Sequence, residues 1–194
     1  MVRPREFDAD VVTDRALDLF WRKGYQRASL ADLERETGVG RKGLYNTFGS
    51  KQGLFLEALT RYEARAVALI LAPLESEGAG RAAIEHVFQM LTSQEGQLKG
   101  NRGCLFCLTA ENDVASSAEV ATRVRGYLRR LQHAFASALR GAQTAGDLGT
   151  QKDPEASADF LVGTVMGLSA MVRAVRPRTQ IMHYIDTALA ATLD

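Results

Sequence analysis

The sequence of 194 residues has only two cysteines, four prolines and no uninterrupted apolar run that approaches 18 residues. Without such a run we expect no membrane-spanning helix. The first ten residues, MVRPREFDAD, carry charges where a secretory signal would carry an apolar core, so secretion is not expected. Two cysteines three positions apart exclude a disulfide framework and indicate a reducing, cytoplasmic setting.

Alternating β-branched and aromatic residues are also scarce, whereas apolar residues recur with helical period. Between residues 8 and 23, Val12, Ala16, Leu17, Phe20 and Trp21 form one apolar stripe, and Gly24 follows as a stop signal. The chain is 46% apolar, which is enough to bury a sizeable core at this length. The sequence therefore predicts an all-α fold.

The net charge of +1 conceals an uneven distribution. Seven cations face three acids between Arg22 and Lys51, a net charge of +4 that leaves −3 for the remaining chain. A basic block on a slightly acidic body is typical of a phosphate-binding module joined to another domain, although a solvated charged surface has the same composition.

Two short helices are predicted inside this basic block. Ser29 is a candidate N-cap for the first, which Gly38 ends, and the second covers residues 41 to 48. Ser50 is a candidate N-cap for a longer helix that follows. Three helices within about forty residues, with a tight glycine turn between the second and third, are typical of a helix-turn-helix unit.

The helix at 41 to 48 has the composition of a groove-reading helix. We expect Val39, Leu44 and Phe48 to anchor it inward, which leaves short and cationic side chains outside. Arg41 and Lys42 would reach guanine edges or phosphates, while glycines at 40 and 43 would let the backbone approach DNA. Tyr45 and Lys51 are candidates for phosphate contacts.

The stretch SLADLERETGVGRKGLYNTFGSKQGLFLEAL resembles the DNA-binding segment of the tetracycline-repressor (TetR) family of bacterial regulators, over residues 10 to 60 or so. The resemblance implies a phosphate contact from Ser29. It implies contacts to bases or nearby backbone from Arg41, Lys42, Gly43, Asn46 and Thr47, and phosphate contacts from Tyr45 and Lys51. Two departures are Gly40, where the family usually has a capping serine, and Gly43, where threonine is frequent. Glycine costs up to about 1 kcal/mol against alanine inside a helix.

Residues 1–51 are thus predicted to form the DNA-binding domain and residues 52–194 a helical effector-binding and dimerisation domain. Within the latter, amphipathic helices are expected after Gly80, over 104 to 113 and over 117 to 145, and Asp153–Pro154 starts a strongly apolar helix that Pro177 ends. A last helix covers 179 to 192. A helix that is apolar nearly all round needs partners on more than one side. The resemblance implies a homodimer through the last two long helices and a palindromic double-stranded operator.

Cys104 and Cys107 leave several hypotheses open. A zinc site would need more ligands, and His86, His133 and His183 show no ligand spacing, so no metal and no cofactor are expected. A reactive Cys104 would begin a helix just after Lys99 and Arg102, which would lower its pKa. The GCL sequence also resembles a TetR branch in which some members sense electrophiles or oxidants through this cysteine. The alternative is a small core residue, and Cys107 is expected to face the core.

An effector pocket is a further implication of the resemblance. Its apolar candidates are Phe88, Leu91, Phe106, Tyr127, Leu131 and Met166, and its polar candidates are His86, Glu111 and Asn112. The effector itself stays unknown. The chain is therefore interpreted as a DNA-binding repressor, not an enzyme, that a small effector or a thiol modification releases. The alternatives are a small helical thiol-dependent enzyme that uses Cys104, and a protein–protein adaptor.

Overall fold

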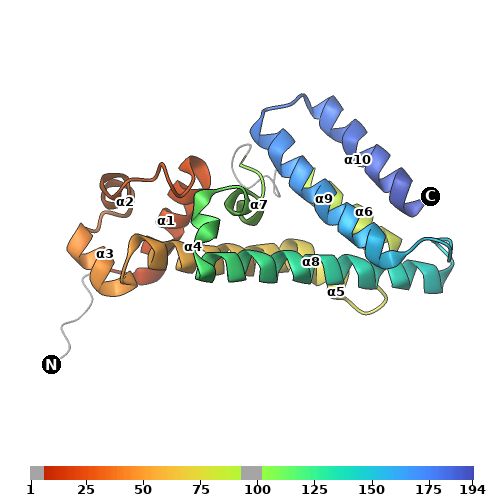
Figure 1. The fold of residues 1–194 in the computed structure, drawn as a ribbon, viewed down its shortest axis with the longest axis horizontal. Helices are drawn as coiled ribbons and strands as arrows, with labels where there is room; N and C mark the ends of the chain where they lie inside the picture. The colour runs from red at the N-terminus through yellow and green to blue at the C-terminus, as the bar shows by residue number, and fades with distance from the viewer. Residues whose placement is uncertain (1–6, 93–101) are drawn as a thin grey trace.

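The structure, a computed structural model, describes residues 7–92 and 102–194, and every regular element in these two ranges is helical (Figure 1). The helices are α1 (Ala9–Lys23), α2 (Leu30–Thr37), α3 (Arg41–Phe48), α4 (Lys51–Ala66), η1 (Val67–Leu71), α5 (Ala72–Glu75), α6 (Arg81–Thr92), α7 (Leu105–Ala110), η2 (Asp113–Ser116), α8 (Ala118–Ala145), α9 (Pro154–Arg173) and α10 (Arg178–Leu193). The predicted all-α fold is confirmed.

Helices α1, α2 and α3 gather at one end of the molecule and form the predicted helix-turn-helix unit (Figure 1). Ser29 begins α2 with a capping box, in which its hydroxyl accepts the N–H of Asp32 and the Asp32 carboxylate accepts the N–H of Ser29. Gly38 ends α2 in the left-handed conformation at φ 75°. Ser50 likewise begins α4 by accepting the N–H of Gly53. The caps predicted from the sequence are therefore present.

Helix α4 runs on through the π-helical turn η1 into α5, and the sequence did not predict this turn. The N–H of Ala72 donates to the carbonyl of Val67, five residues earlier. Pro73 gives a physical reason, because proline has no N–H to donate and its ring clashes with the carbonyl four residues before it in a regular α-helix. One wide turn ahead of Pro73 keeps the helix continuous.

Helix α8 is the longest helix, α9 packs against it, and α10 packs against α9 and α6 (Figure 1). Asp153 caps α9 as predicted, with Pro154 at its first position. The predicted end at Pro177 is wrong, because α9 ends at Arg173 and Val175 then takes a left-handed conformation at φ 52°. The N–H of Arg176 closes this turn on the carbonyl of Met171.

Helix α9 is the one helix in the described ranges that is long and apolar enough to cross a membrane by length and composition. The expectation based on uninterrupted apolar runs missed this property. Leu161, Val165 and Leu168 bury one face of the helix in the chain's own core. Only 39% of its apolar window is buried, and Phe160, beside the buried face, is 51% exposed. Within residues 7–92 and 102–194, α9 therefore carries an apolar surface without a partner.

The predicted boundary between residues 51 and 52 falls at the beginning of α4. Helix α4 packs against α1, which lies in the predicted DNA-binding domain, and against α7, which lies in the predicted effector-binding domain. It therefore contacts both predicted domains. The division into 1–51 and 52–194 stays a prediction.

Candidate functional site

The outer face of α3 is polar and cationic, as the sequence predicted. Arg41, Lys42 and Asn46 are exposed, whereas Leu44 is buried. Val39 and Phe48 are half-buried and pack against the core. The three apolar anchors therefore lie inward, and α3 presents its charged side chains to solvent.

A carboxylate from α2 caps α3 in place of the missing serine. Gly40 is the N-cap of α3 and has no side chain to offer, but Glu34 Oε1 accepts the N–H of Arg41. Glu34 also lies close to Gly40, 3.9 Å from where a Cβ atom would stand. Since a carboxylate at a helix start satisfies a free N–H, Glu34 stabilises the beginning of α3 from the neighbouring helix.

Not all of the seven basic side chains between Arg22 and Lys51 are available to a ligand. Three of them form ion pairs: Arg22 with Glu36 at 2.9 Å, Lys23 with Asp32 at 2.9 Å, and Arg35 also with Asp32. The pKa of Asp32 is lowered far below its ordinary value by hydrogen bonds from Lys23, Ser29 and Arg35. Within residues 7–92 and 102–194, no acid pairs with the other four basic side chains, which are Arg27, Arg41, Lys42 and Lys51.

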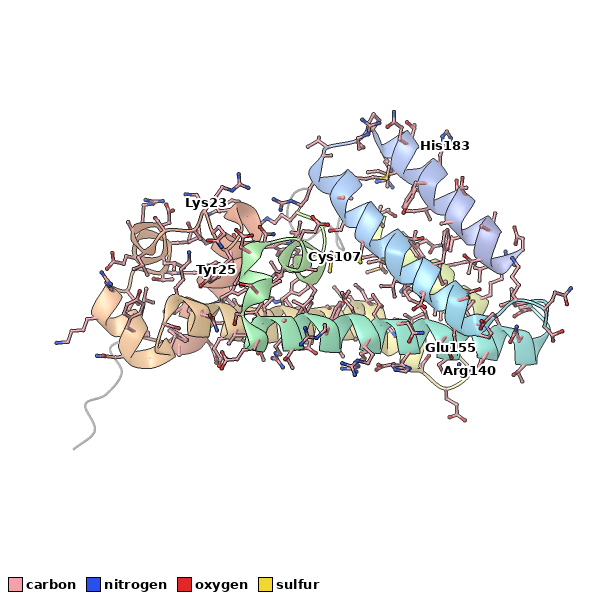
Figure 2. All side chains as sticks on the ribbon, viewed as in Figure 1. Lys23, Tyr25, Cys107, Arg140, Glu155 and His183 are labelled. Carbon is pink, nitrogen blue, oxygen red and sulfur yellow. The ribbon has the colours of Figure 1, made fainter. Side chains whose placement is uncertain are left out.

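Tyr25 follows α1 at the helix-turn-helix end of the molecule (Figure 2), while Tyr45 belongs to α3 and Lys51 begins α4. The Lys51 Nζ atom lies 4.4 Å from the centre of the Tyr25 ring, and burial lowers the pKa of Lys51. Burial also raises the pKa of Tyr25, with a smaller contribution from Tyr45. Arg41 lies 5.3 Å over the Tyr45 ring. The aromatic rings thus hold both cations in place. Tyr25 was not among the residues predicted from the sequence, although it directly follows the helix-ending Gly24.

The structure gives Ser29, Gly43 and Thr47 local surroundings that the sequence did not reveal. Ser29 is exposed, but its hydroxyl already donates to Asp32 at 2.8 Å. A Cβ atom at Gly43 would stand 2.8 Å from Val39 Cγ1 and 3.2 Å from Phe7 Cε1, so inward packing explains this glycine. Thr47 is half-buried in a groove that also contains acidic residues. The nucleic-acid contacts of all three stay predictions.

Cys104 and Cys107 form a second candidate site. Cys104 is the N-cap residue of α7, Cys107 lies in its first turn, and both are buried free thiols. A hydrogen bond from Cys107 lowers the pKa of Cys104 to about 7. Burial opposes this shift, whereas the Tyr62 hydroxyl and backbone groups assist it. The same hydrogen bond raises the pKa of Cys107 well above its ordinary value. Cys104 is therefore the thiolate of the pair and Cys107 its donor.

The cause of this shift differs from the predicted one. Lys99 lies outside the described residues, and Arg102 pairs with Asp18 at 2.6 Å and lies over the ring of Trp21. Arg102 thus contacts side chains of α1 and is not a cause of the lowered pKa of Cys104. Tyr62, on α4, supplies the hydroxyl, and burial together with Cys104 raises the pKa of Tyr62 well above the ordinary value.

A cavity of about 50 Å³ lies against Cys104. Its wall is mostly apolar and comes from α1, the α4–η1 helix, α6 and α9: Trp21, Tyr62, Ala66, Leu69, Ile70, Met90, Leu91, Gly103, Val165, Leu168, Ser169 and Val172. The π-helical turn places Ile70 in this wall. Because a water molecule needs about 10–15 Å³ on this measure, the cavity holds only a few non-hydrogen atoms.

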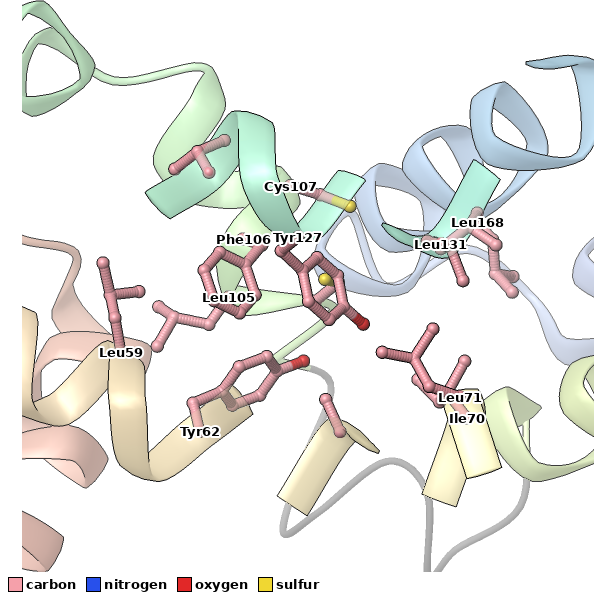
Figure 3. Packing of buried hydrophobic residues seen from close by; sticks show 14 of the residues in the cluster. Leu59, Tyr62, Ile70, Leu71, Leu105, Phe106, Cys107, Tyr127, Leu131 and Leu168 are labelled. Atoms are coloured by element: carbon pink, nitrogen blue, oxygen red, sulfur yellow. The ribbon is translucent and has the colours of Figure 1, made fainter. Parts of the chain in front are cut away.

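Most of the predicted pocket residues lie elsewhere. Leu91 lines the cavity. Phe106 and Tyr127 stack at 4.2 Å, and the hydroxyls of Tyr62 and Tyr127 are directed to the same region (Figure 3). Phe88 stacks on Phe135, and Leu131 is core. Met166 is half-buried on α9, and His86, Glu111 and Asn112 are exposed. The structure therefore does not assemble these candidates into one pocket.

The backbone on either side of Cys104 connects two helices that are distant in sequence. Trp21 Nε1 on α1 donates to the carbonyl of Gly103 at 2.8 Å, and the N–H of Cys104 donates to Ser169 Oγ on α9 at 2.8 Å. Gly103 has φ 67°, and a Cβ atom there would stand 2.5 Å from Ser169 Oγ, so only glycine fits. A displacement of the Cys104 backbone therefore acts on α1 and α9 together.

In the described part of the chain, the thiols have neither a cluster of metal-ligating side chains nor an imidazole base beside them. No group of three metal-ligating side chains occurs there. His86, His133 and His183 are all exposed on α6, α8 and α10. A nucleophilic Cys104 without a paired base lacks the usual partner of a cysteine-dependent enzyme.

Two protein-family models match the sequence. The model for bacterial regulatory proteins of the tetR family matches residues 12–58, and the model for the tetracyclin repressor-like C-terminal domain matches residues 80–188. The regulator YezE of Bacillus subtilis, itself described as uncharacterized, is 28% identical over 191 residues, 98% of each chain. The Escherichia coli repressor ComR is 29% identical over 191 residues, 96% of this chain and 90% of ComR. A cysteine mutant of the regulator CifR, solved in complex with a 26-base-pair double-strand operator DNA, superposes with a TM-score of 0.83 at 32% identity, covering 97% of this chain and 99% of that one.

Proposed function

The chain belongs to the TetR family of bacterial regulatory proteins, and on this basis we propose that it is a cytoplasmic, homodimeric repressor that reads a palindromic operator and is released by modification of Cys104. YezE and ComR are transcriptional regulators, and CifR was solved on operator DNA. DNA-binding transcriptional regulation is thus the function of this chain that the comparisons support.

The exposed face of α3 is the observation that carries the proposal. Arg41 and Lys42 have no acid partner in the described ranges, and Glu34 secures the beginning of the helix without occupying their side chains. A short helix with cations outside and apolar anchors inside fits the major groove. Lys51 supplies a phosphate contact beside it.

The unpartnered face of α9 supports the dimer. Phe160 is half exposed there, and the exposed Gly163 and Ala170 further along the helix are small residues that allow close helix approach. We propose that this face, with α10, packs on the same face of a second chain. A two-fold dimer places two α3 helices on half-sites roughly 34–36 Å apart, which is one turn of DNA.

Release is proposed to begin at the thiol. Gly103 and Cys104 hydrogen-bond to α1 and α9, so a group added to Cys104 in a cavity of about 50 Å³ displaces a backbone that both helices share. Because α1 supports the helix-turn-helix unit and α9 the proposed dimer, the separation of the two α3 helices changes. A difference of a few kcal/mol between states suffices.

The test is selection of an operator from a random double-stranded DNA library, followed by anisotropy with wild-type protein and Arg41→Ala. We expect recovery of a palindrome, weaker binding by the variant at unchanged melting temperature, and a salt slope smaller by roughly 0.9 for each phosphate that the variant no longer neutralises. Arg140→Ala is the matched control, since Arg140 pairs with Glu155 on the far end of the molecule (Figure 2). Absence of any enriched sequence at low salt refutes the groove assignment.

A further inference from the structure

We propose that Cys104 and Cys107 close into an intramolecular disulfide when a small peroxide oxidises Cys104, which makes the sensor a reversible dithiol pair. The bond deepens the thiol-dependent release proposed above and rests on it for its role, although its formation is measurable without DNA. Membership of the family does not by itself imply such a bond.

The spacing of the two cysteines on α7 permits the bond. Cys104 is the N-cap residue and Cys107 the third residue of the helix, so the pair spans nearly one helical turn. Helix geometry sets Cα atoms three residues apart at about 5 Å. Disulfides need Cα atoms about 4.4–6.8 Å apart, so the two residues lie within the range in which a disulfide can close. Both cysteines are free, buried thiols, so neither sulfur has to leave another covalent bond first.

The two sulfurs have unequal surroundings that divide the roles. Cys104 lines the cavity and accepts hydrogen bonds from Cys107 and Tyr62, so it is the sulfur that meets an oxidant. Cys107 is 1% exposed and does not line the cavity. It lies between the helix-turn-helix end and α9 (Figure 2). An oxidant therefore reaches Cys104 first, and Cys107 waits one turn away as the resolving thiol.

The size of the cavity indicates the class of oxidant. About 50 Å³ accommodates a few non-hydrogen atoms, and the wall is mostly apolar. Hydrogen peroxide is uncharged and has two oxygen atoms, so it fits, whereas bulky hydroperoxides do not. Oxidised glutathione is larger still and charged.

The chemistry balances with peroxide as the two-electron oxidant. The Cys104 thiolate attacks one peroxide oxygen, an S–O bond forms, the O–O bond breaks, and the departing hydroxide takes a proton to become water. Cys107 then attacks the sulfenic sulfur, an S–S bond forms, and the S–O bond breaks. The departing hydroxide combines with the proton lost by Cys107 as the second water. Two thiols are oxidised to one disulfide and one peroxide is reduced to two waters.

The test compares wild-type protein with Cys107→Ser, whose hydroxyl still donates toward Cys104. Each reduced protein receives stoichiometric hydrogen peroxide, is denatured in N-ethylmaleimide and is weighed by intact-mass spectrometry. In a parallel sample dimedone replaces N-ethylmaleimide at the denaturation step, because dimedone is too large for the cavity of the folded protein. For the wild type we expect loss of both maleimide labels, no dimedone adduct, and recovery of both labels after dithiothreitol. For Cys107→Ser we expect a dimedone adduct on Cys104.

Wild-type protein that keeps both labels, takes up dimedone or forms disulfide-linked dimers overturns the proposal. Cys107→Ala serves as a second variant in case the serine substitution destabilises the buried site. Anisotropy on the operator separates the two hypotheses. If the disulfide forms but the protein stays on the operator, the bond is supported and thiol-dependent release of DNA is refuted. If peroxide releases wild type and Cys107→Ser from the operator equally and equally reversibly, thiol-dependent release is supported and the disulfide is refuted as its switch.

Discussion

The reactivity of Cys104 should depend on pH in a way that an ordinary thiol does not. Its pKa is lowered to about 7 from a usual 9.0. At pH 7 about half of the thiol is then ionised, against roughly 1% at the usual pKa, so the thiolate fraction is about 50-fold higher. The nucleophilicity of a thiolate falls with its pKa, by about 8-fold over this range. Together, the two effects should make Cys104 react about 6-fold faster at pH 7 than an ordinary thiol would.

The assay is the rate of alkylation of Cys104 by iodoacetamide between pH 5 and 10, followed by intact mass in a Cys107→Ser background so that one thiol reacts. The rate should rise through a midpoint near pH 7 and then level off, because the thiolate is the reacting form above the pKa. Tyr62→Phe removes one hydrogen-bond donor and should move the midpoint upward. The same assay in a Cys107→Ala background removes the largest contribution, the hydrogen bond from position 107, and should move the midpoint further.

A midpoint at or above pH 8.5 in the Cys107→Ser protein would refute the assignment of Cys104 as the thiolate. An unchanged midpoint in Tyr62→Phe would show that the hydroxyl does not stabilise the thiolate. Circular dichroism of each variant at the extremes of pH controls for unfolding, since both sulfurs are buried.

Three other substitutions test the coupling, the helix cap and the dimer. Trp21→Phe removes the N–H that Gly103 accepts, so the unfolding free energy should fall by about 1 kcal/mol or more, and peroxide should release less operator in anisotropy. Glu34→Ala should weaken operator binding although Glu34 contacts no DNA in the proposed mode, because α3 loses a cap of about 1 kcal/mol; unchanged affinity would count against this role. Phe160→Asp should shift the sedimentation of the protein from dimer toward monomer, and an intact dimer would remove α9 from the interface.

Local signals predicted the helix-turn-helix end well. Ser29, Gly38 and Ser50 act on residues three or four positions away, so their roles can be read from the chain alone. The inward placement of Leu44 follows from helical period in the same way. The structure adds that Arg41 and Lys42 of α3 are exposed to solvent, as the proposed DNA contacts require.

The surroundings of the thiols could not be predicted, because they depend on contacts between distant parts of the chain. Tyr62 precedes Cys104 by 42 positions, and Trp21 meets Gly103 across 82. Arg102, expected to assist the thiol, is taken by Asp18 on α1. The lining of the cavity could not be predicted for the same reason, since apolar periodicity does not distinguish a cavity wall such as Leu168 from solid core.

The hydrogen bonds that Gly103 and Cys104 make to α1 and α9 also work in the opposite direction. Coupling between two sites is reciprocal, so if oxidation of Cys104 weakens operator binding, operator binding must equally disfavour oxidation of Cys104. Protein bound at its operator would then be the last fraction to react, and unbound protein would consume the first peroxide. The cell's surplus of repressor would set the threshold at which the regulated genes respond.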